Sequence, residues 1–119
     1  MVTFTFSEDV IGFDAGDITV GNGTAGLLTI VSASEYTSMI TPLVDGIVTV
    51  ELAADVATDA ATNGNIASNQ FSVLYDGTNP EVVITSTASG TTNVPFTNTI
   101  TFSEDVTGFT VSDIVVGNG

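Results

Sequence analysis

Carboxylate and amide side chains are the residues of this sequence whose types and spacing indicate a binding site. They gather after the first strand-like run, in a long acidic loop, and on both sides of a glycine- and proline-containing segment. Hard oxygen ligands in this number favour Ca²⁺. The alternative, that they are solvated loop residues and turn formers, stays open. The candidate ligands are Glu8, Asp9, Asp55, Asp59, Asn63, Asn65, Asp76, Glu104 and Asp105.

The composition excludes several classes of function. Lysine, arginine, histidine, cysteine and tryptophan are absent, whereas aspartate and glutamate number 14 and give a formal net charge of −14. Such a chain cannot neutralise phosphates, so we expect neither nucleic-acid binding nor attraction to anionic membranes. No apolar run approaches the roughly 20 residues that cross a bilayer, so no membrane insertion is expected. Catalysis is not expected either, because adjacent strand-end residues such as Glu8 and Asp9 point apart.

An internal repeat determines where these acids recur. Segment 5–10 returns with identical residues as segment 101–106, at an offset of 96 residues. Gly12-Phe13 returns as Gly108-Phe109 at the same offset. A period of this length fits a whole β-sandwich domain and is too long for one turn of a solenoid. The sequence therefore predicts tandem domains.

Alternating apolar and polar residues predict strands, as in the first run, where Val2, Phe4 and Phe6 share one face. Short polar turns separate the runs, and residues 55–68 form one long loop. A helical turn within residues 50–62 is the alternative there, because alanine favours helix. About seven strands at this spacing predict an all-β, immunoglobulin-like Greek-key sandwich. In the letters of that fold, strands B to G are expected at residues 2–7, 17–21, 27–32, 36–41, 47–54 and 71–75, and strand A at residues 82–87.

Residues 76–80, Asp-Gly-Thr-Asn-Pro, are typical of a linker, because proline cannot continue a β-ladder. We expect residues 1–79 to be a repeat that lacks its first strand, and residues 80–119 to be the first strands, A to C, of the next repeat. Strand A can complete a sandwich in its own chain or in a neighbouring molecule. Met1 leads straight into a strand, so we expect it to be a start placed inside a longer protein.

The run Val-Thr-Phe-Thr-Phe-Ser-Glu-Asp-Val at residues 2–10, with Gly12-Phe13-Asp14 and residues 45–50, resembles the bacterial Ig-like repeats of giant type I-secreted adhesins. The likeness covers almost the whole chain. It implies a non-catalytic scaffold at the extracellular cell surface, with neighbouring repeats as partners. Related extender domains bind calcium at domain junctions, which implies an ion between Asp76 and the Glu104-Asp105 pair.

In an immunoglobulin-like path, the loop after strand B and the loop between strands F and G lie at the same end. We therefore expect Glu8 and Asp9 to converge there with Asp55, Asp59, Asn63 and Asn65. The long loop departs from the family form, which resembles Asp-Ala-Ala-Gly-Asn-x-Asn, because Thr62 is inserted and Gly64 is displaced. The ligand geometry thus differs from that of the family.

Three functions compete. The leading hypothesis is a spacer or extender module of an adhesin, stiffened by calcium at the joints. The second is a subunit of a filament or surface layer, a homo-oligomer linked by strand exchange, which the separation of strand A from its sandwich suggests. The third is a carbohydrate-binding accessory module, which the absence of tryptophan disfavours.

Overall fold

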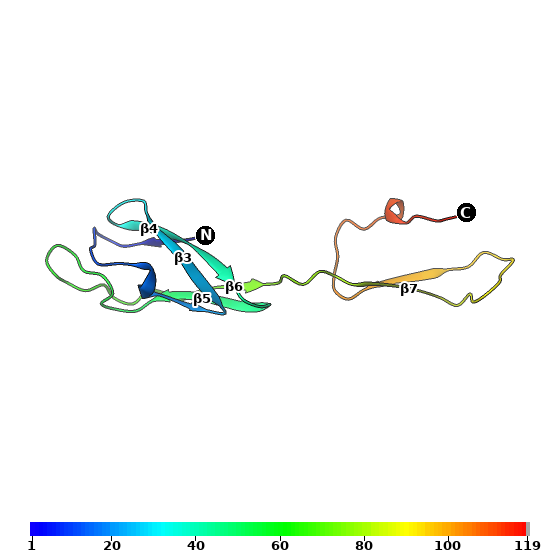
Figure 1. The fold of residues 1–119 in the computed structure, drawn as a ribbon, viewed down its shortest axis with the longest axis horizontal. Coiled ribbons are helices and arrows are strands. Elements are labelled where there is room, and N and C mark those ends of the chain that lie inside the picture. Colours follow the sequence, from blue (N-terminus) through cyan, green and yellow to red (C-terminus); the bar gives the residue numbers. More distant parts are fainter. Residues whose placement is uncertain (119) are drawn as a thin grey trace. The chain divides into compact units, whose positions relative to one another are not determined.

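A computed structural model describes residues 1–118 of the chain. The chain forms two compact units, Met1–Gly77 and Thr78–Gly119, both visible in Figure 1. The boundary lies two residues before the one expected after residue 79. Gly119, the last residue of the partial repeat expected from residue 80, lies outside the described residues. Among those described, no helix is long and apolar enough to cross a membrane.

The first unit consists of two antiparallel three-stranded sheets. One has the order β1-β4-β3 and the other β2-β5-β6. These are the neighbours B-E-D and C-F-G of an immunoglobulin-like sandwich, so the structure confirms the predicted fold class. The elements of this unit are β1 (Val2–Thr5), η1 (Ala15–Asp17), β2 (Ile18–Gly21), β3 (Gly23–Ile30), β4 (Glu35–Pro42), β5 (Gly46–Leu52) and β6 (Phe71–Tyr75).

An aromatic cluster fills the core between the sheets. The ring of Phe13 packs edge-on against Phe4, Phe6 and Tyr36, with centroid distances of 5.7, 5.3 and 5.1 Å. Such T-shaped contacts add to the stabilisation from burial. The Tyr36 hydroxyl donates to the carbonyl of Ala33 at 3.1 Å, so its polar atom is satisfied inside the core. The cluster ties the loop after β1 to the sheet β1-β4-β3.

Two local features differ from the expected strands. β3 begins at Gly23, earlier than expected, and its register against β4 shifts between Ala25 and Leu28, as in a β-bulge. Asp17 belongs to the 3-10 helix η1 and not to a strand, because Asp14 and Asp17 form a capping box around that turn. No helix forms within residues 50–62 of the described chain, where β5 ends at Leu52 and turns follow.

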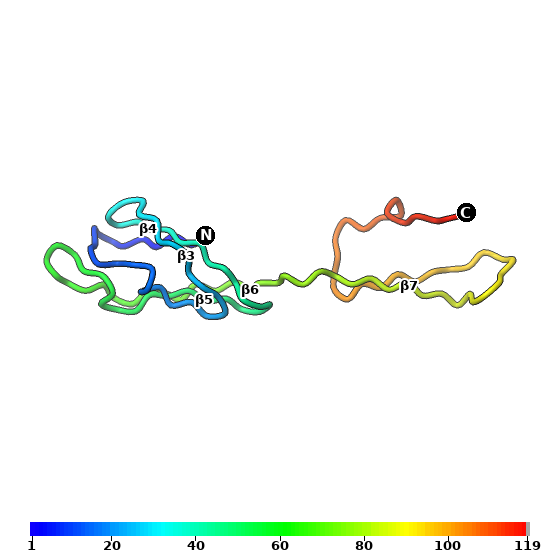
Figure 2. Tube along the Cα trace, viewed as in Figure 1, coloured from blue at the N-terminus to red at the C-terminus, as the bar shows by residue number. Residues whose placement is uncertain are grey.

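After one additional strand, the second unit reproduces the start of the first. Strands β7 (Val82–Ser86) and β8 (Asn98–Phe102) form an antiparallel pair, and the 3-10 helix η2 (Val111–Asp113) follows, as the trace in Figure 2 shows. The rings of Phe102 and Phe109 meet at 5.1 Å and 70°, nearly matching the 5.3 Å and 69° of Phe6 and Phe13. Each pair member is separated from its counterpart by the repeat offset of 96 residues.

The expected strand C of the second repeat was wrong. Residues 114–116 follow η2 without strand pairing, although their counterparts in the first unit lie in β2. There, β2 is held by its ladder to β5. The described part of the second unit has no counterpart of β5, so its backbone groups lack the neighbour that would make them a strand.

Phe13 and Phe109 offer a matched test of the core. Phe13 is 8 % exposed and Phe109 is 44 % exposed. Replacing Phe13 by alanine should lower the free energy of unfolding of the first unit by about 3–5 kcal/mol, because it removes buried ring contacts and leaves a cavity. Phe109→Ala should leave that transition unchanged in urea denaturation followed by circular dichroism. Equal losses for both variants would contradict this packing.

Candidate functional site

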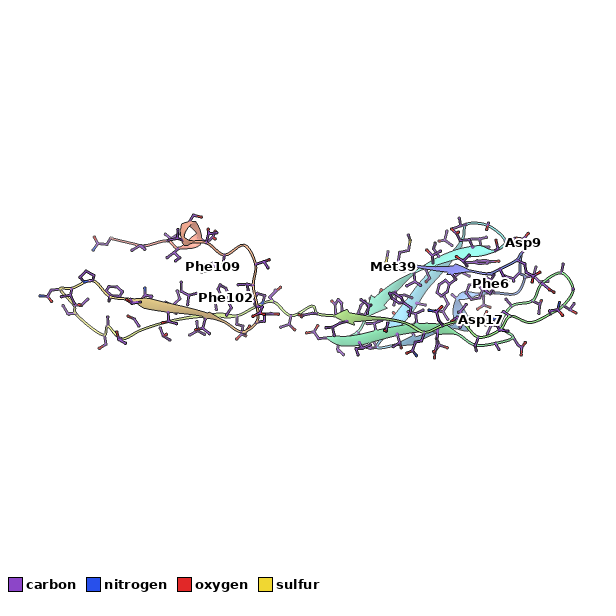
Figure 3. All side chains as sticks on the ribbon, turned by 180° about the vertical axis from the view of Figure 1, so that it is seen from behind. Phe6, Asp9, Asp17, Met39, Phe102 and Phe109 are labelled. Atoms are coloured by element: carbon purple, nitrogen blue, oxygen red, sulfur yellow. The ribbon has the colours of Figure 1, made fainter. Side chains whose placement is uncertain are left out.

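A small hollow lies where β1 ends and the loop between β5 and β6 passes it. Glu8 reaches it from the end of β1, and Asp59, Asn63 and Asn65 reach it from the loop. The hollow has a volume of about 70 Å³. Figure 3 shows Phe6 between the sheets and Asp9 at the outer side of the same end. The structure thus brings four of the nine sequence-predicted ligands around one hollow, and Asp9 does not line it.

Asn65 holds the loop together. Its side-chain oxygen accepts hydrogen bonds from the N–H groups of Val56 and Ala57 at 3.0 and 2.9 Å. Its amide nitrogen donates to the carbonyls of Ala53 and Ile66 at 3.0 and 2.9 Å. The oxygen that was predicted to bind calcium therefore already accepts two backbone donors. Asn65 is a structural residue of the loop in this arrangement.

Asp59 organises the tip of the same loop. Its carboxylate accepts from the backbone N–H groups of Ala61 and Asn63, both at 2.8 Å. The side-chain amide of Asn63 donates to the other carboxylate oxygen at 2.8 Å. These bonds, the Asn63 side chain first, lower the pKa of Asp59 below its ordinary value of 3.8. Because the pKa is lower in the folded than in the unfolded chain, the resulting stabilisation is present above that value and is lost as the pH falls through the folded pKa.

Asp55 accounts for the displaced glycine of the loop. Asp55 has a positive φ of 61°, and its N–H donates to the carbonyl of Asn65 at 2.9 Å. Its carboxylate lies so close to Gly64 that a Cβ atom there would collide with it. Gly64 is therefore required at this place for packing. Sequence reasoning took both residues for parts of a ligand loop, whereas the structure uses them to close a turn.

Two of the predicted calcium ligands in the first unit already accept hydrogen bonds. Calcium takes six to eight oxygen ligands, but Asn65 is engaged and Asp59 accepts three hydrogen bonds. Over residues 1–118, no three acidic side chains are grouped as metal ligands. Asp76 belongs to the first unit, and Glu104 and Asp105 belong to the second. An ion shared by these three stays a prediction.

A larger groove runs along β1, which sequence reasoning did not predict as a site. It has a volume of about 560 Å³ and is lined by residues 1–7 on one side and by β5 residues, residues 65–69 and Phe71 on the other. Its one carboxylate, Glu51, accepts from the side chain of Gln70 at 2.9 Å. The lining is mainly apolar and holds no second acid to form a catalytic pair. The signal in the sequence was the unpartnered first strand.

Comparison with protein families identifies the chain. The model of the family described as bacterial Ig-like domain matches residues 1–75, which end with β6. The chain belongs to this family. Bacterial Ig-like domains are structural modules of surface and extracellular proteins and are generally non-catalytic. No curated protein and no solved structure matches the chain.

The role of Asn65 in the bacterial Ig-like domain can be tested against its neighbour Asn63. Asn65→Ala removes four hydrogen bonds to the loop backbone, and we expect the free energy of unfolding to fall by about 2–4 kcal/mol. Asn63→Ala removes one side-chain bond at an exposed tip and should cost clearly less. Both losses should be the same in calcium and in chelator. A loss for Asn65→Ala that occurs only with calcium present would make it a ligand.

Proposed function

We propose that this bacterial Ig-like domain is a non-catalytic extender module of a secreted bacterial surface adhesin. The observation that carries the proposal is the recurrence of one structural pattern along the chain. The ring contact between Phe6 and Phe13 returns between Phe102 and Phe109 at an offset of 96 residues, with nearly the same geometry. Tandem copies of one domain lengthen a protein without adding a new recognition surface in each copy.

The chemistry of the surface supports a spacer. Two of the residues that were predicted to bind calcium, Asn65 and Asp59, hold loop backbone in place. With a net charge of −14 and no cationic side chain, successive domains repel one another. Self-repulsion favours separated, extended domains over collapsed ones. It also keeps such a chain soluble at a cell surface.

Deleting one repeat from the natural protein tests the extender role. Removal of one period of 96 residues should shorten the distance from the cell to the adhesive tip, as measured by electron microscopy of labelled cells. Binding of the isolated tip ligand should stay unchanged, because a spacer makes no contact with it. Loss of ligand binding after a single deletion would show that the repeat is itself a recognition domain.

Calcium at the joint between repeats is the finer part of the proposal. Asp76, Glu104 and Asp105 carry three of the chain's carboxylates on either side of the boundary after Gly77. We expect CaCl₂ to raise the Tm by several degrees over NaCl at equal ionic strength, because an ion that binds only the folded chain stabilises it. Glu104→Gln should reduce this gain and Glu35→Gln should not. Equal Tm values in calcium and in chelator would contradict a bound ion and would support a spacer without metal.

A further inference from the structure

Within residues 1–118, asparagine is directly followed by glycine at two places, Asn22-Gly23 and Asn63-Gly64. Such a pair can modify itself, because the backbone nitrogen of the glycine can attack the side-chain carbonyl carbon of the asparagine. Glycine lets this approach occur with the least hindrance, since it has no Cβ atom. The asparagine side chain must first turn toward that nitrogen. Which pair reacts in the folded chain therefore depends on how firmly each asparagine is held.

The reaction needs only water as a co-reactant. At the second pair, a bond forms between the nitrogen of Gly64 and Cγ of Asn63, the bond from Cγ to Nδ2 breaks, and ammonia leaves with the proton of the Gly64 N–H. Water then opens the resulting cyclic imide. Opening at Cγ gives aspartate. Opening at the backbone carbonyl gives isoaspartate, in which the main chain continues through Cγ.

Asn22 is held firmly by the turn between β4 and β5. Its Nδ2 donates to the carbonyl of Val44 at 2.9 Å, and its Oδ1 accepts from the N–H of Val44 at 3.3 Å. Its own carbonyl accepts from the N–H of Leu43 at 3.1 Å. Its φ is 54°, a conformation that asparagine tolerates better than most residues. The amide of Asn22 must leave Val44 before it can meet the nitrogen of Gly23, so this pair is protected.

Asn63 is held only by the tip of its own loop, where both Asn63 and Gly64 are exposed. Its Nδ2 donates to the carboxylate of Asp59 at 2.8 Å. A bond between two exposed side chains is weak in net terms, because water replaces it when it breaks. The backbone N–H and carbonyl of Asn63 also bond to Asp59, at 2.8 and 3.0 Å. All these bonds join residues of one exposed tip, so a local opening of the tip releases them together.

The nitrogen of Gly64 is available as the nucleophile. Thr58 and Gly64 form an antiparallel bridge that is flanked by a backbone hydrogen bond on each side. In an antiparallel pair, a position between two such bonds exchanges no hydrogen bond itself. The N–H of Gly64 thus gives up no backbone partner across this bridge when its nitrogen approaches Asn63.

Backbone strain at Thr62 favours opening of the same tip. Thr62 directly precedes Asn63 and has a positive φ of 69°. A β-branched residue rarely adopts this conformation, and such strain persists only where the surrounding structure imposes it. Opening of the tip relieves the strain at Thr62. No comparable strain acts at Asn22, where the residue with positive φ is asparagine itself.

We propose that Asn63-Gly64 is a self-modification site, which converts to aspartate or isoaspartate in the folded domain while Asn22-Gly23 is preserved. The product puts a carboxylate where Nδ2 of Asn63 now donates to Asp59, so an attractive contact becomes a contact between like charges. Isoaspartate also lengthens the main chain at the tip. Residues 59–63 therefore loosen as the domain ages. This inference does not rest on the extender function, because it concerns one loop of one domain.

Peptide mapping by mass spectrometry can follow the two sites separately. Cleavage after Phe13, Tyr36 and Phe71 puts the two pairs on different peptides. During incubation of the folded chain at neutral pH, Asn63 should convert at least about tenfold faster than Asn22, because Asn22 must wait for a larger local opening. In urea the two should convert at nearly equal rates, since both precede glycine.

Three outcomes of this mapping would overturn the proposal. The first is equal rates at the two sites of the folded chain, and the second is faster conversion of Asn22. The third is a folded chain whose Asn63 stays intact over the time in which the chain in urea converts fully. In that case the fold would protect both asparagines.

The restraint on Asn63 can be tested with two substitutions around the same hollow. Asp59→Ala removes the acceptor that holds Nδ2 of Asn63 and should raise the rate at Asn63 by about threefold or more, with the rate at Asn22 unchanged. Glu8→Ala changes another residue that lines the hollow and should alter neither rate. An unchanged rate at Asn63 in Asp59→Ala, or an equal rise at both asparagines, would contradict the proposed restraint.

Discussion

Every carboxylate of this domain must be satisfied without a cationic side chain, and this constraint shapes the rest of the structure. The available donors are mostly backbone N–H groups, and the acids lie where turns present them. Asp14 accepts from Gly16 at 2.7 Å, Asp45 accepts from Gly77 at 2.7 Å, and Asp59 accepts from two residues of its own loop. These three acids therefore hold turns and loops in place, and the number of acids does not by itself indicate a ligand site. Hydrogen bonds from N–H groups to charged acceptors are also stronger than neutral ones.

Apolar packing also stabilises the domain. The chain has no cysteine and no cationic side chain, so neither disulfides nor ion pairs between side chains contribute. The rings of Phe4, Phe6, Phe13 and Tyr36 join the loop after β1 to the sheet β1-β4-β3. Phe4 and Phe6 also line the groove along β1. Part of the aromatic core therefore forms the wall of this groove.

Local patterns in the sequence predicted most of the fold. Strand β6 has the expected bounds, residues 71–75, and the repeat offset located the counterpart of β1. Strand C of the second repeat was wrong because strand pairing depends on a distant partner that alternation does not reveal. The site was harder to predict. Asn65 and Asp59 have the residue types of calcium ligands, but which backbone donors surround them depends on how residues 53–66 close on themselves. The groove along β1 is formed by segments that are far apart in the sequence, so no sequence motif indicates it.

The second unit has a consequence for the order in which a repeat folds. Its hairpin, its Phe102–Phe109 contact and its capped turn at Thr110–Asp113 join residues that are near in sequence, and they form without the later strands of a repeat. Contacts of low sequence separation form fast. In a protein that emerges from a ribosome or a secretion channel starting at its N-terminus, each repeat can acquire this nucleus before its last strands are available. In long arrays of nearly identical domains, strands can pair with those of the wrong neighbour. When the local contacts of each repeat form early, such mispairing has less time to occur.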